Sequence, residues 1–253
     1  QALQLNERFA ALVASKRLNE SEDERTIVRK LATATFVLLL KILFQTSLSD
    51  THGMKAIRKE NIQKEINNDG VLKLSLNRPE VLNAMNADLI MGLLDALYEA
   101  KSDKKVRSII ITGNGRGFCS GADLIEGGWP KTEGLSAGEA GSMNMENAFN
   151  PLVKAITQST KPVVNAINGI AAGGGVGLAL TGDIVIASES AKFKLVFGPN
   201  LGIISDVGAS WCVPNLIGRA RANGMGLLGE DISAKQAKEW GLIWDCVPDE
   251  ELI

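Results

Sequence analysis

Two glycine-rich segments, the first at 117–124 and the second at 169–177, carry the residues best suited to chemistry. One of them, Gly169–Gly177, has five glycines in nine residues, and Gly173–Gly175 are consecutive. Because glycine lacks a Cβ atom, the backbone there can approach a ligand closely. The apolar residues that follow suit a helix, whose first N–H groups favour a negatively charged oxygen. The same glycines are equally consistent with tight packing of a helix on a sheet.

Acid–base chemistry in this chain must depend on carboxylates, or on a lysine or cysteine. The one histidine, His52, lies outside the expected core, which argues against a Ser-His-Asp triad or a histidine-ligated metal. The three cysteines are odd in number and widely spaced, so they fit reduced thiols rather than a disulfide framework or a zinc site. We therefore expect no metal, and a cytoplasmic protein.

The composition is that of an ordinary globular protein. Of the 253 residues, 45% are hydrophobic and 22% are charged, which is typical of soluble domains. The net charge of −2 gives no reason to expect nucleic-acid binding, which would show as a basic face. The second glycine-rich segment does not open with GxGxxG, so it is not a dinucleotide fingerprint.

The chain divides near residue 54. Residues 1–53 predict a helical extension that ends in a polar linker, and residues 54–253 predict the core. The apolar run Leu31–Phe44 is interrupted by Lys41 and is too short to cross a bilayer, so we expect no membrane span. A helix packed on a neighbouring surface is favoured there over a helix lying on a membrane.

The elements that position the glycine-rich segments are strands alternating with helices, which predicts an α/β fold. Hydrophobic periodicity predicts a hairpin over 62–66 and 71–76 and a helix over 86–100. Further strands are expected at 108–112, 162–167, 183–187 and 191–197. Further helices are expected at 147–159, 218–228 and 234–240, with one opening at Leu124. Loops are expected at 113–123 and 127–142, and a last element begins at 247.

Three motifs in this order resemble the crotonase (enoyl-CoA hydratase/isomerase) superfamily. They are GFCSGADL at 117–124, NGIAAGGGVGLAL at 168–180 and GDIVIAS at 182–188, preceded by Asn77-Arg78-Pro79 and Asn83-Ala84-Met85. The resemblance extends from Met54 to the last residue. It implies a spiral of ββα turns with flanking helices, a homotrimer or hexamer, and an acyl-CoA thioester as substrate with no further cofactor.

The resemblance also implies an oxyanion hole made of two backbone N–H groups. Matched by position, they belong to Ala122 and Gly174. Such donors stabilise a thioester oxygen when enolisation makes it negative. The segment Asp123, Leu124 and Ile125 matches positions that contact the CoA portion in relatives, although Asp123 also suits a helix N-cap.

The hydratases of the family carry two glutamates that this chain lacks. One would stand at Gly177, and the other would follow Pro199, where Asn200 stands instead. Asp206 is the acidic residue nearby. The segment GIISDVGASW at 202–211 resembles the narrower group of ring-1,2-epoxyphenylacetyl-CoA isomerases, which use one aspartate at this position. An N-cap role for Asp206 is the alternative.

A single carboxylate suits isomerisation, because one base can take a proton from one carbon and return it to another. We therefore expect an isomerase that shifts a double bond or opens a ring epoxide, with Asp206, Ala122 and Gly174 as catalytic groups. Two alternatives stay open: a hydratase that uses Asp206 with Glu126 or Glu146, and a non-catalytic acyl-CoA-binding or scaffold protein. The segment 193–202 is one residue longer than in relatives, which also continue into further C-terminal helices.

Overall fold

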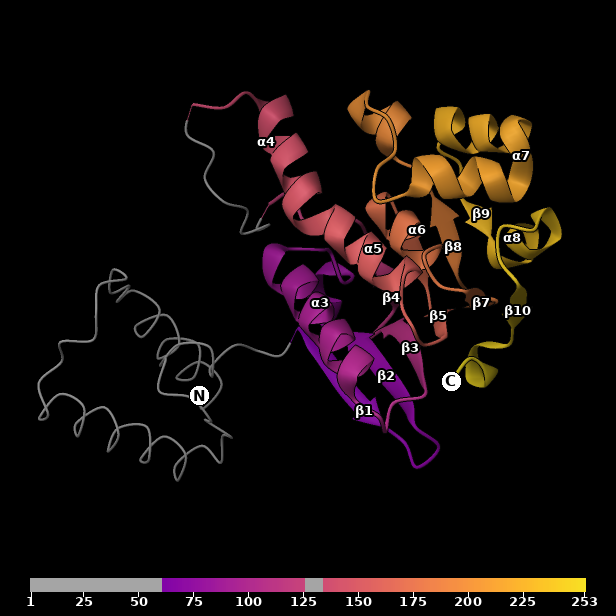
Figure 1. Ribbon diagram of the computed structural model, residues 1–253. Helices are drawn as coiled ribbons and strands as arrows, with labels where there is room; N and C mark the ends of the chain where they lie inside the picture. Colours follow the sequence, from indigo (N-terminus) through magenta and orange to yellow (C-terminus); the bar gives the residue numbers. More distant parts are fainter. Residues whose placement is uncertain (1–60, 126–133) are drawn as a thin grey trace, which may run out of the picture. The chain divides into compact units, whose positions relative to one another are not determined.

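The strands of the computed structural model, which describes residues 61–125 and 134–253, form two sheets (Figure 1). The expected extension over residues 1–53 and its linker lie outside the described residues. The larger sheet has the order β1-β2-β3-β5-β7-β10. Its strands are β1 (Ile62–Ile66), β2 (Val71–Leu76), β3 (Ser108–Gly113), β5 (Val163–Ile167), β7 (Ile184–Ser188) and β10 (Asp245–Val247). All pairs are parallel except β1 with β2.

The smaller sheet has the order β4-β6-β8-β9. Its strands are β4 (Gly117–Cys119), β6 (Ile170–Ala172), β8 (Lys192–Lys194) and β9 (Ile232–Ser233). Along the chain, β3 is followed by β4, β5 by β6, and β7 by β8, so each pair adds one strand to each sheet before a helix follows. This repeated order of two strands and a helix is the spiral of ββα turns that the sequence predicts. The prediction of an α/β fold is confirmed.

The N-terminal hairpin and helix form as the sequence predicts. Asn67 Oδ1 accepts hydrogen bonds from the N–H groups of Asp69 and Val71, and Gly70 adopts a φ of 78°, so the turn between β1 and β2 is closed. Helix α3 (Ala87–Ser102) begins at Asn86, whose side chain accepts a hydrogen bond from the N–H of Leu89. Its leucine-rich face is buried against β1, β2 and helix α5.

Two regions expected to be loops contain regular structure. The segment 113–123 includes β4, which pairs with β6 in parallel. The segment 127–142 includes the start of α4 (Ala137–Asn144), since Ser136 and Glu139 form a reciprocal capping box. A π-helical turn, Met145–Phe149, joins α4 to α5 (Asn150–Thr157).

In the C-terminal part, one helix begins earlier than predicted. Helix α7 (Ala209–Leu228) begins nine residues before the predicted start at Gly218, where the chain has a non-helical φ of 76° and ψ of 163°. Four residues before this kink are buried at helical spacing: Ala209, Cys212, Val213 and Ile217. Helix α8 (Ala234–Trp240) forms as expected, and β10 precedes a short 3-10 turn, Asp249–Glu251.

Strand β8 is shorter than the predicted 191–197. A π-helical turn, Phe197–Leu201, follows it. That the segment 193–202 is one residue longer than in relatives stays a prediction. Across residues 61–125 and 134–253, no helix is both long enough and apolar enough to cross a membrane.

Candidate active site

The second glycine-rich segment is a strand, a turn and a short buried helix. Strand β6 ends at Ala172, Gly173 turns the chain with a φ of 54°, and α6 (Gly174–Ala179) follows. The Gly173 N–H donates to the Lys194 carbonyl at 2.9 Å. In the part of the chain that the structure describes, no acceptor receives the N–H of Gly174. The start of α6 thus presents a free donor.

The two glycine-rich segments touch each other. A Cβ atom on Gly121 would lie 3.0 Å from the Ala172 carbonyl oxygen and 3.2 Å from the Gly174 nitrogen. Gly121 itself adopts a φ of 99°, which favours glycine. Because Ala122 follows Gly121 directly, the structure brings together the two loops on which the predicted oxyanion residues lie.

Met85 fixes the direction of the Ala122 peptide. The Met85 N–H donates to the Gly121 carbonyl at 2.7 Å, and the Asp123 N–H donates to the Met85 carbonyl at 2.9 Å. In this parallel bridge, the carbonyl before Ala122 and the N–H after it both bond Met85. The N–H of Ala122 itself therefore points away from Met85. Within the described ranges, the Ala122 N–H has no acceptor, like the N–H of Gly174.

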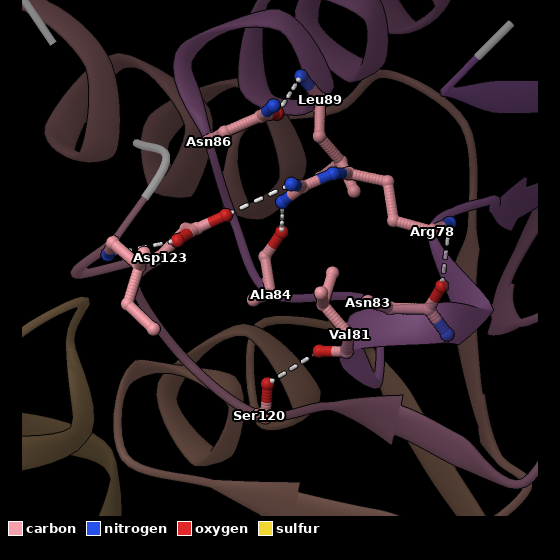
Figure 2. A network of polar contacts seen from close by, with 9 residues as sticks. Arg78, Val81, Asn83, Ala84, Asn86, Leu89, Ser120 and Asp123 are labelled. Atoms are coloured by element: carbon pink, nitrogen blue, oxygen red, sulfur yellow. Dashed lines mark hydrogen bonds and ion pairs between the residues drawn. The ribbon is translucent and has the colours of Figure 1, made fainter. Parts of the chain in front are cut away.

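A buried ion pair holds the other side of the same loop (Figure 2). Arg78 Nη2 lies 2.8 Å from Asp123 Oδ2, and the two side chains are only 9% and 8% exposed. Arg78 Nη1 also donates to the Ala84 carbonyl at 2.6 Å, and Asp123 Oδ1 accepts from the Ile125 N–H at 3.0 Å. The Asp123 carboxylate is therefore turned toward Arg78.

The turn that carries Arg78 is itself fixed by Asn83. The Asn83 side chain accepts from the Arg78 N–H and donates to the carbonyls of Asn114 and Gly117. The Ser120 hydroxyl donates to the Val81 carbonyl (Figure 2). The Ser120 N–H donates to the Leu82 carbonyl. This network joins the Asn77-Arg78-Pro79 motif to the first glycine-rich loop.

Asp206 lies against the start of α6. Its Oδ1 atom is 3.4 Å from the position that a Cβ atom on Gly174 would take. That oxygen is buried and has no hydrogen-bond partner among the described residues. Burial raises the pKa of Asp206 to about 6, although its own backbone N–H opposes the shift. Gly208, not Asp206, is the N-cap of α7, so the alternative structural role is wrong.

The remaining predicted residues differ in exposure. Leu124 and Ile125 form a bend rather than the start of a helix and are 76% and 93% exposed. A contact between residues 123–125 and a CoA portion stays a prediction. Glu146 is exposed on the turn between α4 and α5, and Glu126 lies outside the described residues. At Gly177 there is no space for a side chain, because a Cβ atom would overlap the Val207 carbonyl oxygen.

Comparison with known proteins identifies the family of this chain. Residues 66–253 match the family model described as enoyl-CoA hydratase/isomerase. The chain belongs to the enoyl-CoA hydratase/isomerase family. The resemblance to the crotonase superfamily that the motifs predict is thereby confirmed.

Two curated relatives illustrate the range of activities in the family. The 1,2-epoxyphenylacetyl-CoA isomerase of Escherichia coli is 48% identical over 183 residues, which cover 72% of this chain and 68% of the relative. A probable enoyl-CoA hydratase of Rhodobacter capsulatus is 43% identical over 181 residues, covering 72% and 66%. The chain thus spans about two thirds of the length of these enoyl-CoA hydratase/isomerase relatives.

Solved structures of the family share the fold. A probable enoyl-CoA hydratase/isomerase from Mycobacterium abscessus has a TM-score of 0.67 at 34% identity, with 76% of this chain and 71% of that chain covered. A monofunctional enoyl CoA isomerase from M. smegmatis has a TM-score of 0.63 at 32% identity, with 77% and 80% covered.

Sequence reasoning missed two features of the site. It did not identify Arg78 as the partner of Asp123, although the Asn77-Arg78-Pro79 motif marked the residue. It also did not foresee that Val207 adopts a φ of 49°, a conformation uncommon for a β-branched residue. The adjoining Gly208, with a φ of 80°, was the available signal of a sharp turn.

Proposed function

We propose that the chain isomerises acyl-CoA thioesters by proton transfer, with Asp206 as acid and base. The observation that carries this proposal is the place of Asp206 Oδ1, buried and without a hydrogen-bond partner beside Gly174. A carboxylate oxygen whose bonding capacity is not used by the described residues is free to bind a substrate proton.

In the proposed reaction, ionised Asp206 removes a proton from C2 of a 3-enoyl-CoA. The electron pair of the broken C–H bond moves into the thioester, which becomes a dienolate with its negative charge on oxygen. Protonated Asp206 then delivers the same proton to C4, and the double bond comes to lie between C2 and C3. One group serves both steps, so the catalyst returns to its starting state.

The N–H groups of Ala122 and Gly174 are the proposed donors to the dienolate oxygen. Both lack acceptors among the described residues, and they come from loops in contact. Donors fixed before the reaction need no reorganisation when charge develops, and losing one such donor typically costs about 10²–10³ in turnover. The ion pair of Arg78 with Asp123 and the bridge to Met85 supply this rigidity.

The pKa of Asp206, raised by burial to about 6, suits a group that must alternate between base and acid. A carboxyl group with an ordinary pKa would hold a proton too briefly to return it efficiently at neutral pH. The burial of Asp206 therefore supports catalysis as well as placement.

For the acyl group, we propose only its chemical class. One relative is named 1,2-epoxyphenylacetyl-CoA isomerase, so a ring epoxide is a second substrate class to test beside an enoyl chain. The thioester is the substrate, and no further cofactor takes part in the proposed steps. A trimeric or hexameric assembly stays a prediction.

Hydration is the second candidate function, because another relative is named a probable enoyl-CoA hydratase. A hydratase of this family would need a second carboxylate to activate water. Gly177 has no space for one, Asn200 follows Pro199, Glu146 is exposed, and Glu126 lies outside the described residues. A non-catalytic binding protein is the third candidate and differs from both by showing affinity without turnover.

The deciding experiment follows a 3-enoyl-CoA in deuterated water and resolves the products. The proposal expects a 2-enoyl-CoA that forms faster than any 3-hydroxyacyl-CoA. If the hydroxy product forms directly and dominates, hydration is the function. Binding without either product would support the non-catalytic alternative.

A further inference from the structure

Val207 has an unusual backbone conformation next to the proposed acid/base. Its φ is 49°, in the left-handed region, where L-residues other than glycine are disfavoured by roughly 1–2 kcal/mol. A β-branched side chain makes the conformation rarer still. Such a conformation persists only when its surroundings enforce it.

The surroundings that hold Val207 are two glycines on one face of α6. A Cβ atom on Gly174 would lie 2.9 Å from Val207 Cγ2, and one on Gly177 would lie 3.0 Å from Val207 Cβ and overlap the Val207 carbonyl oxygen. Positions three residues apart face the same way on a helix. Val207, which is only 3% exposed, therefore fills the space left by two absent side chains.

Besides the hydrogen bond from its own backbone N–H, the neighbouring carboxylate has few contacts that fix its position. Oδ1 of Asp206 has no hydrogen-bond partner in the described part of the chain. The Asp206 carbonyl accepts from the Ala209 N–H at 2.9 Å, and this bond ties the backbone to the start of α7, not to α6. Helix α7 packs on α6 as well, and the contact of Val207 with Gly174 and Gly177 is the part of this packing that lies next to the carboxylate.

We propose that Val207 is a positioning residue, which holds the Asp206 carboxylate beside Gly174 by packing into the glycine face of α6. This inference rests on the proposed function for the identity of the reacting group. A displacement of about 1 Å at a reacting group can cost about 10²-fold in rate, so precise packing here has a direct effect on turnover. Asp206 Oδ1 is buried beside this contact, so the packing also shields that oxygen from water.

Two variants test the proposal from opposite sides of the contact. Val207→Ala removes the two methyl groups, and Gly177→Ala introduces a Cβ that displaces the Val207 carbonyl. Both should lower kcat by about 10- to 100-fold, while KM for the acyl-CoA changes less than threefold. Val163→Ala, a buried valine in β5, and Gly141→Ala, an α4 glycine with open space around its Cβ position, are the matched controls.

A second readout does not depend on any activity. The pKa of Asp206 is measured by NMR titration of the full chain labelled with ¹³C at aspartate carboxyl carbons, with Asp206→Asn assigning the signal. It should fall toward the ordinary aspartate value in Val207→Ala and Gly177→Ala, and remain near 6 in both controls. If both test variants keep the wild-type pKa, Val207 does not position Asp206.

The two readouts separate this inference from the proposed function. If the wild-type chain turns over no acyl-CoA but the pKa falls in both test variants, the positioning role stands and the isomerase proposal fails. If the wild type is an isomerase and both test variants retain its kcat and pKa, the positioning role fails and the isomerase proposal stands.

Discussion

The carboxylate of Asp206 lies beside Gly174, with Asp206 Oδ1 3.4 Å from where a Cβ atom on Gly174 would stand. A side chain at Gly174 would therefore occupy the space between the proposed base and the proposed oxyanion donor. The proximity joins two segments, 169–177 and 202–211, that the sequence singles out separately. Because of this proximity, a substitution in one segment should disturb the side chains and backbone of the other.

Gly174→Val should abolish this arrangement. The added side chain would press on Val207 and Met85 as well as on Asp206, since their atoms lie 2.9–3.4 Å from the Cβ position. We expect acyl-CoA affinity and turnover each to fall by more than about tenfold, because a buried site cannot absorb the added volume. Calorimetry and steady-state kinetics measure the two effects, with Gly141→Ala as the control. Unchanged affinity and turnover would remove Gly174 from the site.

The Arg78–Asp123 ion pair should be important for stability. Asp123→Asn leaves a buried guanidinium without its counter-charge, which typically costs about 3–5 kcal/mol. The matched control is Glu99→Gln, which breaks the exposed Lys64–Glu99 pair and should cost no more than about 1 kcal/mol. Denaturant unfolding measures both. Equal losses of stability would show that burial of the Arg78 pair has no special effect.

The pH dependence of activity should follow Asp206. Proton removal needs the ionised carboxylate, so kcat/KM should fall as the pH drops through about 6, where burial has raised the pKa of this group. Helix α6 carries no ionisable side chain, and the first turns of α7 carry only the buried thiol of Cys212. An acid limb near pH 4 would instead indicate a base with an ordinary aspartate pKa.

The raised pKa of Asp206 affects activity and stability in opposite directions: as the pH rises through about 6, activity should increase and the stability of the fold should decrease. Between the ordinary aspartate pKa and about 6, the folded state binds more protons at Asp206 than the unfolded state does, so this group's contribution to stability is lost as the pH rises. Asp206→Asn, which cannot ionise, should therefore melt at a higher temperature than the wild type at pH 7. Melting curves at pH 7 and pH 4 test this. The difference between the two proteins should shrink at pH 4, and a less stable variant at pH 7 would contradict it.

The sequence predicted most of the elements because their signals are local. The hairpin around Asn67 and Gly70 and the capped helix after Asn86 formed within two residues of their predicted bounds. Helix α4 was missed because its glycines and serines resemble a loop, although Ser136 and Glu139 carry the capping signal. The first half of α7 was missed because Pro214 and Gly218 interrupt its pattern.

The candidate site was only partly predictable from sequence. Ala122, Gly174 and Asp206 were named by their motifs, but their proximity depends on the two sheets and could not be read from spacing. The pairing of Arg78 with Asp123 joins segments far apart in sequence. The strain at Val207 follows from packing on α6, and local propensity opposes it.

The most direct test of the account is turnover by Asp206→Asn. The variant keeps the shape of the side chain and removes the base, so turnover should fall by a factor of about 10²–10⁴. Affinity for the acyl-CoA should change little, because the N–H groups of Ala122 and Gly174 remain. With a 3-enoyl-CoA as substrate, the account predicts this loss of rate without loss of binding. Wild-type turnover in Asp206→Asn would contradict it.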